Sequence, residues 1–150
     1  MKSKVKIISP AKKAAKQLDK LSRSLEGPNN VKVGIPKGSN AYPDGTSVIM
    51  VGTVHEFGSP ARGIPQRSFL RSTVEGGRRK YKTLFRKLSK KMVAGNISKK
   101  QALGVIGLQV QGDVQAKISN GISPSLKSRS GTPLIDTGHL RQTITFQVED

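Results

Sequence analysis

Apolar residues recur at spacings of three and four along three stretches of the chain, which predicts three helices. The first stretch covers residues 10–26, with Ser9 suited to cap the helix and Pro10 tolerated in its first turn. The Gly27-Pro28 pair is expected to end it. Its apolar stripe consists of Ala11, Ala14, Leu18, Leu21 and Leu25.

The second helical stretch runs from Ser68 to Ala94, and the third follows Ser98 to about Asn120. The apolar positions of the second are Leu70, Val74, Tyr81, Leu84, Phe85, Leu88 and Met92. Its Gly76-Gly77 pair predicts a kink or a break, because each glycine costs a helix about 1 kcal/mol against alanine. The third has its apolar stripe at Leu103, Ile106, Val110, Val114 and Ile118. The glycines at 104, 107 and 112 are expected to leave room for another element.

Alternation of apolar and polar residues predicts strands at 31–35 and 143–148, which must pair with each other. Residues 47–57 are ambiguous, since β-branched side chains favour a strand while the apolar spacing also suits a short helix. Loops are expected at 37–45, 58–66 and 122–134, and a short turn at 138–141, capped by Asp136 or Thr137.

These elements predict an α+β fold, in which a small antiparallel sheet packs with about three helices and long loops connect them. The length of 150 residues fits one domain. Within residues 1–150 we expect a basic N-terminal helix in 1–28 and a core in 29–150.

Charge narrows the choice of partner. The chain has 27 Lys and Arg against 9 Asp and Glu, a net charge of +18, which points to a polyanionic partner. No apolar run reaches about 18 residues, so we expect no membrane span, and the N-terminus lacks the apolar core of a secretory signal. With no cysteine and two histidines, His55 and His139, we expect neither a metal site nor a cofactor.

The densest basic stretch, RRKYKTLFRKLSKK, covers residues 78–91. Its cations are Arg78, Arg79, Lys80, Lys82, Arg86, Lys87, Lys90 and Lys91. No acidic residue lies between Glu75 and Asp113 in the sequence to neutralise them. If all eight met phosphates, log affinity would fall against log salt with a slope of about −7. The pattern favours backbone contact without base reading, although charge alone also admits an RNA helix or an anionic membrane.

Enzyme motifs are weak. His55-Glu56 begins like a zinc-protease motif but lacks its second histidine, and no nucleophile elbow accompanies Asp136 and His139. Glu56, Glu75 and Asp113 could form a metal-dependent nuclease site only by coincidence, and capping or a surface ion pair explains each more simply. We therefore expect a protein that is not an enzyme.

Two segments carry a resemblance: an E-F-G motif followed by I-P-x-R-x-F-L-R, and P-L-I-D-T-G-x-L-x-x-x-I near the C-terminus. In order and spacing, residues 31–148 resemble the tail-completion or neck proteins of tailed bacteriophages. That group includes the lambda minor tail protein Z type and prophage "virion morphogenesis" proteins. The matching residues are Glu56, Phe57, Gly58, Ile64, Pro65, Arg67, Phe69, Leu70, Arg71, Pro133, Leu134, Ile135, Asp136, Thr137, Gly138, Leu140 and Ile144. Ser68 departs from the family, which commonly has proline there.

The resemblance implies a non-catalytic virion protein at the head–tail junction, present in the host cytoplasm during assembly. It implies a homo-oligomeric ring around the channel for double-stranded DNA, without contact to a membrane. The implied protein partners are the tail terminator, a head-completion protein and the tail tube. The basic stretch 78–91 is the first candidate for DNA contact and the N-terminal helix the second. The alternative is a stand-alone, non-specific nucleic-acid-binding protein, nucleoid- or RNA-associated.

Overall fold

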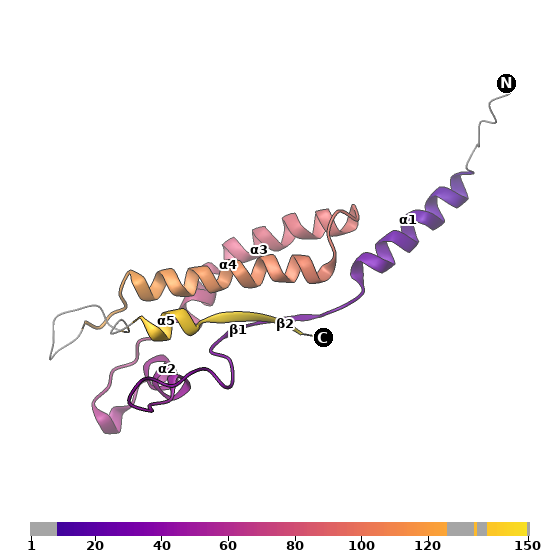
Figure 1. The fold of residues 1–150 in the computed structure, drawn as a ribbon. Helices are drawn as coiled ribbons and strands as arrows, with labels where there is room; N and C mark the ends of the chain where they lie inside the picture. The colour runs from indigo at the N-terminus through magenta and orange to yellow at the C-terminus, as the bar shows by residue number, and fades with distance from the viewer. Residues whose placement is uncertain (1–8, 126–133, 135–137, 150) are drawn as a thin grey trace.

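The computed structural model describes residues 9–125, 134 and 138–149. Within these residues it contains five α-helices and two strands, which confirms the α+β fold and adds two helices to the expected three (Figure 1). Their bounds are α1 Pro10–Leu25, β1 Asn30–Gly34, α2 Val48–Phe57, α3 Arg71–Val93, α4 Lys99–Ser119, α5 His139–Thr143 and β2 Thr145–Glu149. The long loops at 37–45 and 58–66 are present, the second with a 3₁₀ turn at Pro60–Arg62.

The two strands pair antiparallel, with Asn30 opposite Glu149 and Gly34 opposite Thr145. This confirms the predicted pairing of the segments near 31–35 and 143–148. Helix α4 contacts both strands on one side and α3 on the other, so it forms the middle layer of the molecule (Figure 1). Gly107 makes the close approach possible, because a Cβ there would collide with the ring of Phe146.

The core lies where α4 meets α2, α5 and the segment that leads into α3. Its fully buried side chains are Val48, Phe69, Val114, Ile118, Leu140 and Ile144. A second, smaller cluster joins Leu88 and Met92 of α3 to Ala102 of α4. The stripe predicted for α4 therefore faces the core, although Leu103 and Ile106 are only half-buried.

The ambiguous segment 47–57 is helix α2, and its local chemistry explains why. Ser47 caps the helix by accepting a hydrogen bond from the backbone N–H of Met50. Gly58 ends it with a φ of 78°, a conformation that residues with a Cβ rarely adopt. Tertiary contacts outweigh the β-branched composition, because Val48 and Gly52 face the core and Ile35.

Helix α3 continues without a break from Arg71 to Val93, so the break considered at Gly76-Gly77 does not occur. Packing along α4 supplies what the glycines lose in helix propensity. The side chain of Tyr81 lies over Gly77, where a Cβ would clash with its ring. The expected apolar face is also narrower than predicted, since Val74 and Phe85 are exposed, Phe85 at 54%.

Helix α1 forms where the sequence predicts it, with Ser9 accepting from the backbone N–H of Lys12 and Pro10 in the first turn. It projects away from the rest of the protein (Figure 1). Its apolar stripe is largely uncovered: Leu18 and Leu25 are exposed and Leu21 is half-buried, whereas the buried residue of α1 is Ser24.

The short turn expected at 138–141 is helix α5, which begins after Gly138 and leads directly into β2. Gly138 has a φ of 75°, and its position before the helix involves no side-chain cap. The caps expected there, Asp136 and Thr137, lie outside the described residues, as do Pro133 and Ile135.

Candidate nucleic-acid interface

All eight cations predicted to form the basic face of α3 are exposed. Residues four apart in a helix lie on the same side, so these cations fall into rows. Arg78, Lys82, Arg86 and Lys90 form one row, which at 1.5 Å per residue is about 18 Å long. Arg79, Lys87 and Lys91 lie in the row beside it.

We call these seven residues the basic rows. Within the described residues, no ion pair involves any of them. An open groove between their side chains is lined by Arg78, Arg79, Lys82, Thr83 and Arg86. The basic rows therefore present uncompensated positive charge to solvent over about three helical turns.

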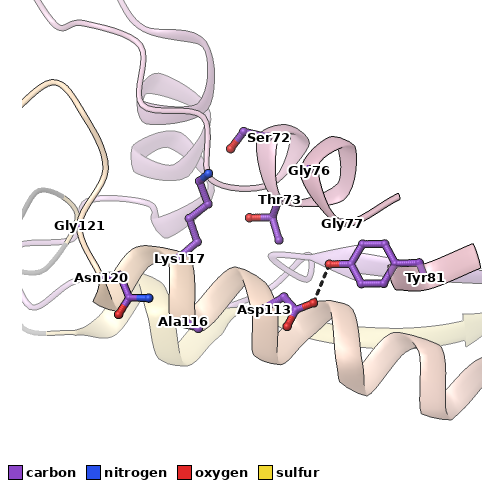
Figure 2. Close-up of a pocket in the computed structure, with 10 residues that line it drawn as sticks. All are labelled: Ser72, Thr73, Gly76, Gly77, Tyr81, Asp113, Ala116, Lys117, Asn120 and Gly121. Atoms are coloured by element: carbon purple, nitrogen blue, oxygen red, sulfur yellow. Dashed lines mark hydrogen bonds between the residues drawn. The ribbon is translucent and has the colours of Figure 1, made fainter. Parts of the chain in front are cut away.

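Lys80 departs from the prediction because it has an acidic partner from another helix. Its Nζ lies 2.7 Å from Oδ1 of Asp113 on α4. The Tyr81 hydroxyl donates to the other carboxylate oxygen of Asp113 at 2.8 Å, as Figure 2 shows. Burial raises the pKa of Asp113, but hydrogen bonds from Lys80 and Tyr81 outweigh it and hold the pKa below its usual value. Lys80 thus belongs to the contact between α3 and α4.

The cleft beside this contact is lined by both helices (Figure 2). It has a volume of about 480 Å³, and its lining includes Gly76 and Gly77. Its carboxylate, Asp113, already accepts from Lys80, Tyr81 and Gln109. Across residues 9–125, 134 and 138–149, no three histidines or carboxylates gather as a metal site would require.

Glu56, the first residue of the E-F-G motif, caps α3 from a different helix. Its Oε2 accepts from the backbone N–H groups of Phe69 and Leu70 at 2.8 and 2.9 Å. Its Oε1 accepts from the Ser68 hydroxyl at 2.7 Å and from the N–H of Arg71 at 3.1 Å. A carboxylate at this position also interacts favourably with the positive end of the helix dipole. The geometry matches the capping interpretation and leaves both oxygens occupied.

The electrostatics of Glu56 follow from the same contacts. Burial alone raises the pKa of this carboxyl, but the Ser68 hydroxyl and the three backbone N–H groups outweigh that effect. The net result is a pKa below its usual value, so Glu56 is ionised at neutral pH. A carboxylate with this role positions α3 and is poorly suited to move protons.

Several other residues of the resemblance that the structure describes have structural roles. Arg67 is buried and donates to the carbonyl oxygens of Pro124 and Ser125 at 2.7 and 3.2 Å. Phe69 and Leu140 lie in the core. Gly58 has no room for a Cβ, which would lie 2.9 Å from the backbone nitrogen of Gln66. We call Glu56 and the residues that it caps the Glu56 joint.

Three other residues singled out in the sequence lie outside the Glu56 joint. Phe57 is 66% exposed despite its place in the motif. Glu75 is exposed in the first turns of α3. His139 begins α5, where its ring contacts that of Tyr42 and its Nε2 lies 2.9 Å from the carbonyl oxygen of Asn40. Glu56 and Asp113 thus have different partners: Glu56 caps the start of α3, and Asp113 accepts from Lys80 and Tyr81.

Sequence reasoning missed the exposed apolar residues on the outer sides of the helices. Leu108 and Val105 on α4 are exposed, and Gly104 and Gly112 beside them have open space where a Cβ would lie. The three glycines of α4 were an available signal, but only Gly107 contacts another element of the described chain. No helix in the described part of the chain combines the length and hydropathy needed to cross a membrane.

Comparison of the chain with protein-family models, with curated proteins and with solved structures finds no match. The resemblance to phage neck proteins therefore rests on the two motifs and their spacing. Of those motifs the structure describes the first in full and, from the second, Leu134, Gly138, Leu140 and Ile144.

Proposed function

We propose that this protein is a non-enzymatic component of the head–tail junction of a tailed bacteriophage, where its basic rows contact duplex DNA. The observation that carries the proposal is the set of seven exposed cations on one side of α3, none with an acidic partner in the described chain. Such a surface binds polyanions, and its charge is costly to assemble without one.

The structure of the Glu56 joint supports the link between the resemblance and the basic rows. Glu56 of α2 accepts from the backbone N–H groups of Phe69, Leu70 and Arg71, where α3 begins. The motif therefore holds in place the helix that presents the cations.

Binding by the basic rows is independent of base sequence. Arg and Lys side chains from one exposed helix face meet phosphates, and the stretch holds few aromatic groups for stacking on bases. With seven phosphate contacts, log affinity falls against log salt with a slope of about −6. Equal affinity for duplexes of different base sequence separates the proposal from a specific DNA reader, which binds its own site far more tightly.

The first experiment measures duplex binding over a range of salt concentrations for the whole chain. The test variant replaces Arg78, Lys82 and Arg86 with Gln, and the matched control replaces Lys12, Lys13 and Lys16 on α1. We expect the test variant to lose about 2.7 from the magnitude of the slope and the control to lose less than half as much. Equal losses in the two variants would show that total charge, not this face, governs binding.

The second experiment separates the junction from the stand-alone alternative. Particles produced without this protein are imaged by electron microscopy. Filled heads and finished tails that remain separate, or joined particles that lose DNA, are the expected result. Normal infectious particles would reject the junction and leave a free nucleic-acid-binding protein, which the same basic rows also support.

A further inference from the structure

In the apolar stripe of helix α1, Leu21 is half-buried, but the four other residues are left exposed by the part of the chain that the structure describes. Leu18 is 67% and Leu25 50% exposed, and Ala11 and Ala14 on the same side are exposed too. We call these four residues the α1 stripe. The helix rests on the turn between α3 and α4 through other positions: Ser24 is buried and the stem of Lys20 packs on Gly95.

Helix α4 has a second uncovered apolar side, opposite its core stripe. Leu108 is 62% exposed, and Val105 lies next to it. Gly104 and Gly112 lie four residues before and after Leu108, and a Cβ at either position would meet no other atom within 4 Å. We call these four residues the α4 outer face. A helix that is apolar on both sides is ordinarily buried on both.

The shapes of the two surfaces are complementary. On α4, Leu108 forms a ridge with a hollow on each side, because glycine leaves the backbone bare at 104 and 112. On α1, Leu18 and Leu25 are large side chains separated by two turns, with alanines in the first half of the stripe. Large side chains packing into hollows beside small residues is the usual way two helices approach closely.

Charge also favours this pairing. The residues around the α1 stripe are Ala15, Gln17 and Ser22, while the cations of α1 lie toward its other side. The α4 outer face is bordered by Gln101 and Ala116, and Lys100 lies next to it at the end that carries Gly104. Two copies of a chain with a net charge of +18 repel each other, so they associate best through surfaces that carry no charge.

We propose that the α1 stripe of one copy docks on the α4 outer face of a second copy. Within one chain the two surfaces do not meet, because α1 is held at the α3–α4 turn and points away from α4 (Figure 1). The contact uses a different surface on each partner, so repeating it closes a ring or grows a filament. The inference shares with the proposed function the expectation of an assembly, but it depends on neither the basic rows nor DNA.

Cysteine cross-linking tests the pairing directly, since the chain contains no cysteine. One preparation carries Leu18→Cys and a second, distinguished by a mass tag, carries Leu108→Cys; the two are mixed and oxidised. The control mixture replaces Leu18→Cys with Lys16→Cys, which lies on the charged side of α1. Both substituted leucines are exposed, so the folded core is unaffected.

We expect about tenfold more tagged-to-untagged dimer in the Leu18→Cys mixture than in the control, because a disulfide requires Cα atoms within about 7 Å. Cross-linking of Leu18→Cys with itself at the same yield would mean that α1 pairs with α1 and would overturn the proposal. So would a yield no greater than that of the control.

Sedimentation of the unmodified chain and of Leu108→Gln provides a second measurement without cysteine. The association constant of the copies is expected to fall about tenfold or more, which corresponds to loss of one well-packed apolar contact. Unchanged association would contradict the docking site. Neither measurement contains DNA, so failure here leaves the salt-dependence test of the basic rows intact, and failure there leaves this test intact.

Discussion

The start of α3 and its exposed surface differ in whether their charged groups have partners within the protein. At the Glu56 joint, one carboxylate is buried and accepts four hydrogen bonds from Ser68, Phe69, Leu70 and Arg71. Along the basic rows, seven cations are exposed and have no acidic partner within the described chain. The backbone N–H groups at the start of α3 are therefore hydrogen-bonded within the protein, whereas the cations on its surface are available to another molecule.

This contrast separates residues that build the protein from residues that act on a partner. Glu56 was one of the acidic residues considered for catalysis, and its four hydrogen bonds are those of a helix cap. The cations of the basic rows, in contrast, have no acidic partner within the described chain that would give them a structural role. A polar group that its own fold satisfies is evidence for architecture, whereas an exposed, unpartnered cluster of one charge is evidence for binding.

The largest expected effect is on the Glu56 joint. Glu56→Gln keeps the size of the side chain but turns one acceptor into a donor that faces backbone N–H groups. We expect a loss of about 3 kcal/mol in the free energy of unfolding, and a melting temperature about 10 °C lower. Denaturant unfolding checks it, with the exposed Glu75→Gln as a control expected to stay within about 0.5 kcal/mol. A small effect would mean that the joint is dispensable.

Two glycines of α4 allow its inner and outer sides to be compared: Gly107 packs against the strands, and Gly112 faces open space. Gly107→Ala should cost about 2 kcal/mol in unfolding free energy, because its Cβ would lie 2.8 Å from Val31 and against the ring of Phe146. Gly112→Ala should instead stabilise a dilute, dissociated chain by up to about 1 kcal/mol, since the space there is open. A destabilised Gly112→Ala would show that the outer side is already used within one chain.

The free energy of unfolding should also depend on pH, because the Glu56 joint contains a carboxyl group that titrates in acid. The pKa of Glu56 is lower in the folded protein than its ordinary value of 4.5, so the unfolded chain binds protons first as the pH falls. The stabilisation from Glu56 is therefore complete above that value and is lost as the pH drops through the folded pKa. Unfolding free energies measured at about pH 5 and about pH 3 should differ less in Glu56→Gln than in the unmodified protein. Asp113, whose pKa is lowered as well, accounts for part of the remainder.

The smallest effect distinguishes two neighbouring lysines of α3. Lys82→Gln should reduce the salt slope of DNA binding by about 0.9 and leave stability unchanged. Lys80→Gln should lower stability by about 0.5 kcal/mol, because it removes the pair with Asp113, and should change the slope by less than half as much. If the two slopes change equally, the pairing of Lys80 does not remove it from the DNA-binding face.

Local patterns predicted much of the fold because local interactions form it. The N-caps Ser9 and Ser98 act within three residues of their own helices, and so both helices begin where the sequence predicts. The strand pair was predictable because apolar and polar residues alternate in two segments, and the sequence offered neither segment another strand to pair with. Residues 47–57 stayed ambiguous, because their composition favours a strand and only contacts with Ile35 and the core make them a helix.

The candidate site was predictable in its composition and not in its details. Clustering of cations on α3 follows from helical periodicity alone. The loss of Lys80 to Asp113 joins residues 33 positions apart and has no local signal. Phe85 is a second such detail: its apolar character predicted burial, but no other element covers it and it is exposed within the described structure.

By itself, the sequence determined the α+β class, the three stretches that form α1, α3 and α4, the strand pairing and the excess of positive charge. These depend on composition and on contacts within a few residues. Only the tertiary structure decided that Glu56 caps a helix, that Lys80 is paired, and that the apolar stripe of α1 faces outward. Each of those outcomes depends on which distant groups lie within hydrogen-bonding or packing distance, and that distance is set by the whole fold.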